Sequence, residues 1–215
     1  MIHQYTTEQE EFWAGEFGNA YVQRNQGDLL VASNIDLFSK ALRSAQCISN
    51  CLEFGANIGL NLRALQALYP RMQQHAIEIN SDAVHELSNV IPAENVAHTS
   101  ILHYEARRQF DLVLIKGVLI HINPESLQAV YEKLHDSTGR YLMVCEYYNP
   151  TPVTLKYRGH ENRLFKRDFA GEILDLYPDL MLLDYGFVYR RDPKFPQDDG
   201  TWFLLEKKQK SLVTS

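Results

Sequence analysis

Apolar runs alternate with amphipathic segments along most of this chain. The runs predict seven strands, at 47–54, 73–79, 95–101, 110–120, 140–148, 180–189 and 201–207. Segments at 58–69, 81–90, 124–136 and 166–177 have helical spacing, and Ser81 is the expected N-cap of the second. The unbroken apolarity of 110–120 is typical of a strand covered on both faces. Two further helices are expected before the first strand, over 6–25 and 28–43.

This alternation predicts an α/β fold with a doubly wound, seven-stranded, mostly parallel sheet of Rossmann-like type. No helix separates the last two strands, so the final strand is expected to be antiparallel. At 215 residues the chain has room for a single domain. We expect an N-terminal helical lid or cap over 1–45 and a Rossmann-like core over 46–215. No strand or helix is assigned between the fifth strand and the helix at 166–177.

Composition narrows the functional classes. A net charge of −6 disfavours a general nucleic-acid binder, which normally carries excess basic residues. The N-terminus lacks the basic start and apolar core of a signal peptide, and no stretch reaches the roughly 20 apolar residues of a membrane span. The three cysteines are expected to be reduced, in a cytoplasmic protein with no membrane partner. Cys47 and Cys51 lack a second ligand pair for zinc and are predicted as core residues of a strand, so no metal site is expected.

The stretch "CLEFGANIGLNL" at 51–62 joins the first strand of the predicted core to a helix. Gly55 and Gly59 free the backbone for a tight turn and for close contact with a ligand. Glu53 either accepts hydrogen bonds from an ammonium or braces the loop. Glu78 ends the next strand, where a carboxylate is suited to bind ribose hydroxyls. Together these features predict an adenosine-containing ligand beyond the strand ends.

The spacing argues against a dinucleotide, because the G-x-G-x-x-G fingerprint would need glycine where Asn57 and Leu60 stand. The pattern E-x-G-x-N-x-G instead resembles the first motif of class I S-adenosylmethionine-dependent methyltransferases, E/D-x-G-x-G-x-G. Asn57, in place of the middle glycine, is either a ligand or a residue suited to a left-handed turn. "FDLVLIKGVLIHINPESL" at 110–127 resembles the fourth-strand motif of the same superfamily.

This resemblance implies S-adenosyl-L-methionine as cofactor and S-adenosyl-L-homocysteine as product. The Gly55 backbone should approach the methionine moiety, and the Lys116 carbonyl should accept from its ammonium. Ser100 should border the adenine where many relatives carry an acid. The cofactor-binding candidates are Tyr21, Arg24, Glu53, Gly55, Asn57, Gly59, Glu78, Ile79, Ser100, Ile101, Lys116 and Gly117.

A narrower resemblance covers nearly the whole chain. "EEFWAGEFGNAYVQRN", "KGVLIHINPESL", "EYYNPTPVTLKYRGHENRLFKRDFAGEILD" and "DYGFVYRRD…DDGTWFLLEK" are similar to methylases associated with pseudaminic acid biosynthesis. That bacterial family implies transfer to an oxygen or nitrogen of a small anionic acceptor. A nonulosonic sugar acid or sugar nucleotide is the first choice, and the protein is expected to be a monomer or homodimer.

Candidate catalytic residues lie near the ends of the fourth and fifth strands. His121 is either a general base or a residue packed beneath the cofactor. Tyr147 and Tyr148 either line the acceptor pocket or pack in the core. The substrate-binding candidates are Glu146, Tyr157, Arg158, His160, Lys166 and Arg167.

Two other surfaces have both a functional and a structural interpretation. Lys156, Arg158, Arg163, Lys166 and Arg167 form a basic cluster that either binds an anionic acceptor or is ordinary solvated surface. Helical spacing places Trp13, Phe17, Tyr21 and Arg24 on one face. That face is either core or a lid, with Arg24 holding the cofactor carboxylate.

Three other functions are weighed. A catalytically silent cofactor-binding scaffold and a methyltransferase of another small metabolite stay open. A methyltransferase of RNA or DNA bases is disfavoured by the acidity and by the missing N/D-P-P-Y motif after the fourth strand.

Overall fold

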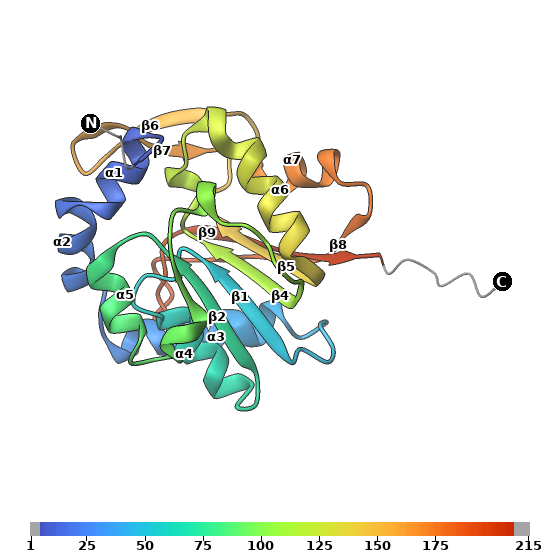
Figure 1. Cartoon of the computed structure of the whole chain (residues 1–215). Helices are drawn as coiled ribbons and strands as arrows, with labels where there is room; N and C mark the ends of the chain where they lie inside the picture. The colour runs from blue at the N-terminus through green and yellow to red at the C-terminus, as the bar shows by residue number, and fades with distance from the viewer. Residues whose placement is uncertain (1–4, 209–215) are drawn as a thin grey trace.

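The computed structural model describes residues 5–208, which form a seven-stranded sheet between two layers of helices (Figure 1). The sheet order is β3-β2-β1-β4-β5-β9-β8. The strands are β1 (Asn50–Phe54), β2 (Gln73–Glu78), β3 (Val96–His98), β4 (Phe110–Lys116), β5 (Thr138–Glu146), β8 (Leu180–Val188) and β9 (Gly200–Lys207). The first five are parallel, and β9 pairs antiparallel with both β5 and β8. The predicted doubly wound fold is confirmed. Residues 1–4, which belong to the N-terminus judged to lack a signal peptide, lie outside the described residues.

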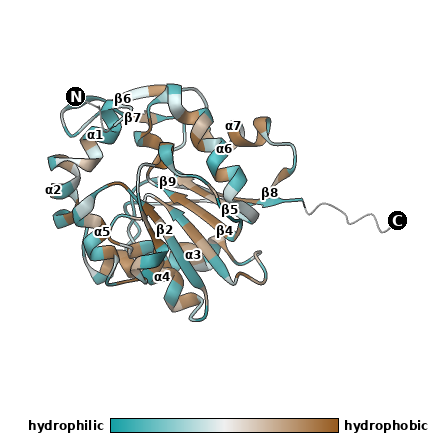
Figure 2. Ribbon diagram, viewed as in Figure 1, coloured by the Kyte–Doolittle hydropathy of each residue, from teal (hydrophilic) through white to brown (hydrophobic). Residues whose placement is uncertain are grey.

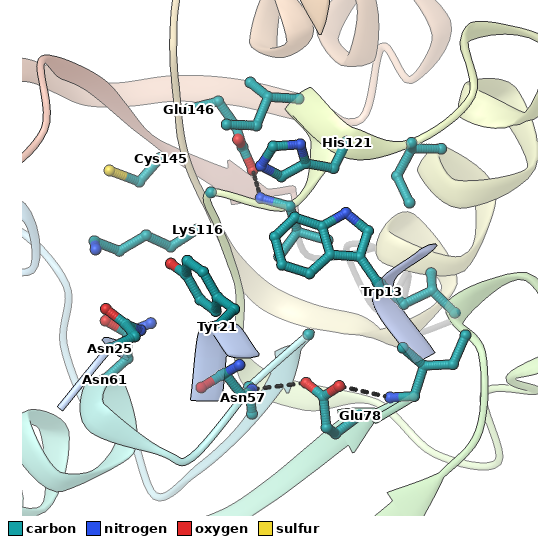
Figure 3. Close-up of a pocket in the computed structure, with 18 of the residues that line it drawn as sticks. Trp13, Tyr21, Asn25, Asn57, Asn61, Glu78, Lys116, His121, Cys145 and Glu146 are labelled. Atoms are coloured by element: carbon teal, nitrogen blue, oxygen red, sulfur yellow. Dashed lines mark hydrogen bonds between the residues drawn. The ribbon is translucent and has the colours of Figure 1, made fainter. Parts of the chain in front are cut away.

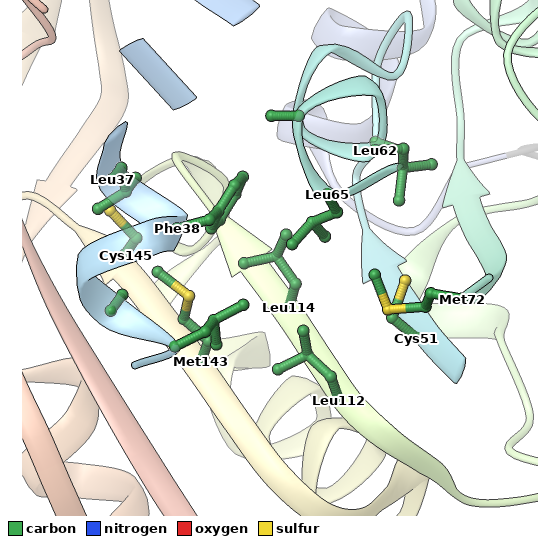
Figure 4. Packing of buried hydrophobic residues seen from close by; sticks show 14 of the residues in the cluster. Leu37, Phe38, Cys51, Leu62, Leu65, Met72, Leu112, Leu114, Met143 and Cys145 are labelled. Atoms are coloured by element: carbon green, nitrogen blue, oxygen red, sulfur yellow. The ribbon is translucent and has the colours of Figure 1, made fainter. Parts of the chain in front are cut away.

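Helices cover both faces of the sheet because alternate strand residues point to opposite sides. One face packs against α3 (Asp28–Ala41), α4 (Leu60–Leu68) and α5 (Ser81–Leu87), and the other against α6 (Leu127–Ser137) and α7 (Phe169–Leu176). On the first side, Phe38 and Leu65 meet Leu112 and Leu114 of the central strand (Figure 4). Hydrophobic residues concentrate on the central strands and hydrophilic ones on outward helix faces (Figure 2). This packing fixes the strand ends that carry the site.

The N-terminal segment is two helices and not the single predicted one. α1 (Glu8–Ala14) and α2 (Glu16–Arg24) meet at Gly15, which has extended backbone angles. Gly18 lies so close to the Trp13 carbonyl that a Cβ there would be 1.9 Å from its oxygen. The chain therefore turns sharply, yet Trp13 still contacts both Phe17 and Tyr21 edge to face.

The polar connection at 150–165 contains a hairpin that the sequence did not reveal. β6 (Val153–Tyr157) pairs with β7 (His160–Lys166), and the turn has Arg158 at φ 49° and Gly159 at φ 88°. The residues of β6, V-T-L-K-Y, do alternate apolar and polar, but the stretch is short, follows Pro150 and Pro152, and is almost entirely exposed. The hairpin packs on the N-terminal helices: Gln9 donates to the Asn162 carbonyl at 3.1 Å (Figure 1).

Several predicted boundaries shift for local reasons. β1 begins at Asn50, so Cys47 lies before the strand, exposed and at φ 55°, and the prediction that it is a core residue is wrong. Cys51 is buried in the strand, as predicted. Asn80, and not Ser81, caps α5, since its side chain accepts from the Ala83 N–H at 3.0 Å. Within residues 5–208, no helix has the length and apolarity needed to cross a bilayer.

Candidate active site

A cavity of about 450 Å³ lies at the C-terminal ends of β1, β2, β4 and β5 (Figure 3). Its size falls within the roughly 300–1,000 Å³ of small-molecule sites, and its position is the expected one for an open α/β sheet. The N-terminal helices wall one side through Glu10, Trp13 and Tyr21, and the β8–β9 loop contributes Gln197 and Asp198. The cavity is therefore enclosed by segments from both ends of the chain.

The turn after β1 needs two residues in the left-handed region. Gly55 has φ 73°, and a Cβ there would lie 2.7 Å from a Val118 methyl group. Asn57 has φ 49°, and its own side-chain oxygen accepts from the Ile58 N–H at 2.9 Å. The prediction that Asn57 occupies a left-handed turn is thus confirmed. Like Gly55, the residue also lines the cavity.

Gly59 serves packing and does not line the cavity. It precedes α4 at φ 79°, which delays the helix start to Leu60, and a Cβ would lie 2.8 Å from Leu87. The second glycine therefore lets α4 begin close against α5. Gly59 is not among the residues that line the cavity, so its predicted contact with a ligand is not supported.

Glu78 lies at the end of β2 beside the Gly55 turn. Its carboxylate accepts from the backbone N–H groups of Asn57 at 2.7 Å and of Ile79 and Asn80 at 2.8 Å each. It is 5% exposed, and burial raises its pKa despite these hydrogen bonds. Because the carboxylate still lines the cavity, its remaining lone pairs are available to ligand hydroxyls.

Glu53 lies beneath the turn, outside the cavity lining. Asn61 Nδ2 donates to its Oε1 at 2.6 Å, while Glu53 Oε2 and Asn61 Oδ1 are buried without a partner. Burial raises the Glu53 pKa to about 8. The bracing alternative for Glu53 fits this placement, and Asn61, which donates to it, lines the cavity.

The carboxylate that lies next to Ser100 comes from α1 and not from β3. Ser100 lies at the end of β3, and its hydroxyl donates to Glu10 Oε1. The other Glu10 oxygen accepts from the Thr6 and Thr7 N–H groups at 2.7 and 2.8 Å, as the N3 residue of a capping box. Glu10 and Ser100 are buried and line the cavity with Ile101. The T-x-x-E pattern was visible in the sequence, but its distance from residue 100 concealed the contact.

His121 is held by packing on the side of the cavity formed by aromatic rings. Its Nδ1 lies 2.6 Å from the Arg163 carbonyl and so donates to it, and the Trp13 and Tyr157 rings lie 4.7 Å away. Burial lowers its pKa to about 4. Neutral His121 therefore keeps a free Nε2 lone pair next to the ligand space (Figure 3).

Three consecutive residues at the end of β5 and just after it, Cys145, Glu146 and Tyr147, line the cavity, whereas Tyr148 is 44% exposed and is not among the lining residues. Glu146 Oε1 accepts from the Val118 and Leu119 N–H groups at 2.9 and 3.0 Å, and its Oε2 is buried without a partner. Burial raises the Glu146 pKa to about 7. The carboxyl is thus poised to exchange a proton near neutral pH.

The basic cluster does not enter the cavity. Lys156, Arg163 and Arg167 form ion pairs with Glu161, Glu8 and Glu172. His160, Arg158, Lys166 and Arg167 are absent from the lining, although Tyr157 is part of it. Arg158 and Lys166 lie over the rings of Tyr157 and Tyr147, at 5.8 and 4.9 Å from the centroids. Positive charge therefore borders the cavity behind two of its aromatic residues.

Arg24 also lies outside the cavity lining, over the Phe17 ring at 5.5 Å. Tyr21, one turn earlier, lines it as expected. Amide side chains that the sequence gave no reason to select line it too: Gln9, Asn25, Asn34, Asn61, Asn123 and Gln197. They come from segments far apart in the chain, so no local motif marks them.

The residues present fit an adenosylated amino acid. A glycine turn at φ 73° offers bare backbone, and the Glu78 carboxylate beside it offers an acceptor for ligand hydroxyls. Ile79, Ser100, Ile101, Lys116 and Gly117 complete that part of the lining, as predicted. No group of three potential metal-binding His, Cys, Asp or Glu residues occurs in the described part of the chain.

Comparison with known proteins bears on the fold and on the domain family. Residues 52–139 match the family model described as a methyltransferase domain. No curated protein matches the chain. One similar structure is the magnesium protoporphyrin IX methyltransferase of Synechocystis PCC 6803 with bound S-adenosylmethionine, at 13% identity and a TM-score of 0.65 over 94% of this chain and 99% of that one. Another is the N-methyltransferase NodS of Bradyrhizobium japonicum WM9 with S-adenosylhomocysteine, at 14% identity and a TM-score of 0.60 over 87% and 91% of the two chains. A third is an amino pentose methyltransferase of Micromonospora echinaspora, at 9% identity and a TM-score of 0.60 over 89% and 96%. The domain match and the shared fold support the predicted class I S-adenosylmethionine-dependent methyltransferase.

Proposed function

We propose that this protein transfers a methyl group from S-adenosylmethionine to an oxygen or nitrogen of a small anionic acceptor. The observation that carries the proposal is the Gly55 turn beside Glu78, open to a cavity large enough for a nucleoside and more. The cofactor supplies an activated methyl group on its sulfonium. The chain's own residues then have to position the acceptor, exclude water and remove a proton.

A sugar acid of the nonulosonic type, or its nucleotide-activated form, is the preferred acceptor. Amide and phenol side chains around the cavity suit a polyhydroxylated molecule, and Arg158 and Lys166 border it with positive charge. One structurally similar protein is an amino pentose methyltransferase, which supports a sugar acceptor for a protein of this fold. The resemblance of several sequence segments to methylases associated with pseudaminic acid biosynthesis supports a sugar acid as that acceptor.

Glu146 and His121 are the proton acceptors that the geometry favours. Glu146 has one oxygen fixed by two backbone N–H groups and the other without a partner. His121 is neutral with Nε2 free, and the Trp13 and Tyr157 rings fix its plane. Tyr147 completes this side of the cavity as an acceptor-binding group.

Calorimetry and a methyl-donor assay test the proposal together. The purified protein should bind S-adenosylmethionine and its demethylated product and ignore nicotinamide dinucleotide. Turnover over a panel of sugar acids, sugar nucleotides and unrelated small metabolites then identifies the acceptor. Binding without turnover on any panel member favours a silent scaffold, and absence of binding contradicts the proposal.

A further inference from the structure

Asp198 is a carboxylate of the cavity lining that forms no ion pair within residues 5–208. It lies in the loop between β8 and β9 and is exposed, whereas its neighbour Asp199 pairs with Arg190 at 3.4 Å. The other acids of the lining are buried and accept hydrogen bonds from their own chain, namely Glu10, Glu78 and Glu146. Asp198 is therefore the lining carboxylate that is available to a ligand.

The sheet places Asp198 on the acceptor side of the cavity. β9 lies next to β5, and the register pairs Glu146 with Thr201. Because β9 runs antiparallel to β5, its first residues lie at the sheet edge where β5 ends, which brings Asp198 beside Tyr147. β4 and β5 separate this position from β1, which carries the Gly55 turn. Asp198 is thus remote from the nucleoside position.

Three phenols share this side of the cavity with the carboxylate. Tyr21, Tyr147 and Tyr157 all line it. Burial raises the pKa of Tyr147, and the charge of Asp198 and a hydrogen bond to that carboxylate raise it further. Burial also raises the pKa of Tyr21 to about 12, with smaller contributions from Tyr157 and Asp198. The phenols therefore stay neutral, and Asp198 supplies the negative charge among them.

Aromatic faces complete a surface suited to a cation. The Trp13 ring lies 5.3 Å from the Tyr21 ring and 4.7 Å from the His121 ring (Figure 3). The His121 ring lies 4.7 Å from that of Tyr157. Neutral rings together with one carboxylate attract an ammonium group through the ring faces and the charge. A hydroxyl can also donate to Asp198, but it carries no positive charge for the rings to attract.

We propose that Asp198 binds an amino group of the acceptor, beside the Tyr147 hydroxyl, and that this nitrogen is the atom methylated. The inference rests on the proposed function and names amines as the acceptor class. The ammonium loses a proton to Glu146. The nitrogen lone pair then bonds to the methyl carbon as the carbon–sulfur bond breaks, and that bond's electron pair stays on sulfur. Since Arg158 and Lys166 border the cavity with positive charge, an acceptor with both an amine and an acid matches the site.

The test uses two sugar acids that differ in one group, 2-amino-2-deoxygluconate and gluconate. Calorimetry measures their binding to the protein saturated with S-adenosylhomocysteine. The unsubstituted protein should bind the amine about 10- to 100-fold more tightly, the usual effect of a charge-assisted hydrogen bond. In Asp198→Asn this preference should disappear while affinity for S-adenosylhomocysteine stays unchanged, and Asp198→Glu should keep part of the preference. Thermal unfolding of each variant checks that the fold is intact.

Asp199→Asn is the matched control, because it neutralises the adjacent carboxylate, which is outside the cavity lining. It should keep the preference for the amine. Any product formed with S-adenosylmethionine should carry the new methyl group on nitrogen, which mass spectrometry and NMR locate. The inference is overturned if the unsubstituted protein binds both acids equally or neither, if the preference survives in Asp198→Asn, or if the methyl group is on oxygen. Failure to bind S-adenosylhomocysteine would instead contradict the proposed function.

Discussion

The hydroxyl of Ser100 donates a hydrogen bond to the carboxylate of Glu10, which joins the end of β3 to a helix 90 residues earlier. The same carboxylate caps α1 through Thr6 and Thr7. One side chain therefore both starts the N-terminal helix and holds it over the sheet. Since both residues line the cavity, the wall near the predicted adenine position depends on this contact.

Glu10→Ala should destabilise the protein by about 1–3 kcal/mol, because it removes a capping box and leaves the buried Ser100 O–H without its acceptor. Ser100→Ala should cost less, about 1 kcal/mol, since the helix cap survives. Denaturant unfolding measures both effects. In the double variant the two losses should be less than additive, and full additivity would show that the two residues do not interact.

Glu78→Gln should weaken binding of S-adenosylhomocysteine about tenfold or more, because a carboxylate accepts from ribose hydroxyls better than an amide does. The comparison ligand is the 2′,3′-dideoxy analogue, whose affinity should be nearly the same in both proteins. Some loss of stability is also expected, since the amide N–H₂ would meet backbone N–H donors. An equal loss for both ligands would mean that Glu78 only shapes the turn.

Gly55→Ala should destabilise the turn by about 1–3 kcal/mol and abolish tight cofactor binding. The new Cβ would occupy a φ of 73° and lie 2.7 Å from Val118. Adding Val118→Ala relieves the contact but not the backbone strain, so stability should recover only in part. Full recovery, measured by thermal unfolding, would assign the whole effect to the steric contact.

His121 should make the protein less stable as the pH falls from 6.5 to about 4. Burial holds its folded-state pKa near 4, below the ordinary 6.5, so the unfolded chain takes up the proton first. The stabilisation is fully present above pH 6.5, and about 3 kcal/mol of it is lost over this window. His121→Asn keeps a donor for the Arg163 carbonyl and should flatten the dependence. An unchanged pH profile in this variant would contradict the assignment.

Glu146 should have the opposite pH dependence. Its folded-state pKa, raised by burial to about 7 from 4.5, favours the protonated form, so its stabilisation is complete below pH 4.5 and is lost as the pH rises through 7. Glu146→Gln should therefore gain stability relative to the unsubstituted protein at pH 8 but not at pH 4. It should also lose turnover while retaining cofactor affinity; unchanged turnover would remove Glu146 as proton acceptor.

Local pattern was enough to predict the sheet and the cofactor side of the site. The unbroken apolarity of β4 marks a strand covered on both faces, and Gly55 and Glu78 stand at strand ends where any open α/β sheet binds its ligand. The structure decides between the two tyrosines that the sequence left open, because Tyr147 lines the cavity and Tyr148 is exposed and does not.

Features made by contacts between distant segments were not predictable. The alternation V-T-L-K-Y of β6 spans only five residues, four of them exposed, and no buried face marks it as a strand, so the hairpin was missed. The acid near Ser100 comes from α1, which no spacing rule connects to β3. Arg163 and Arg167 looked like ligands for an anion, but neighbouring carboxylates already neutralise them.

The β6–β7 hairpin and the two N-terminal helices hold each other through Gln9 and Asn162 and through the rings of Phe12 and His160. The same two segments wall the cavity together, through Glu10, Trp13 and Tyr157. We therefore expect that loosening the junction between Gln9 and Asn162 would change the residence times of cofactor and acceptor together.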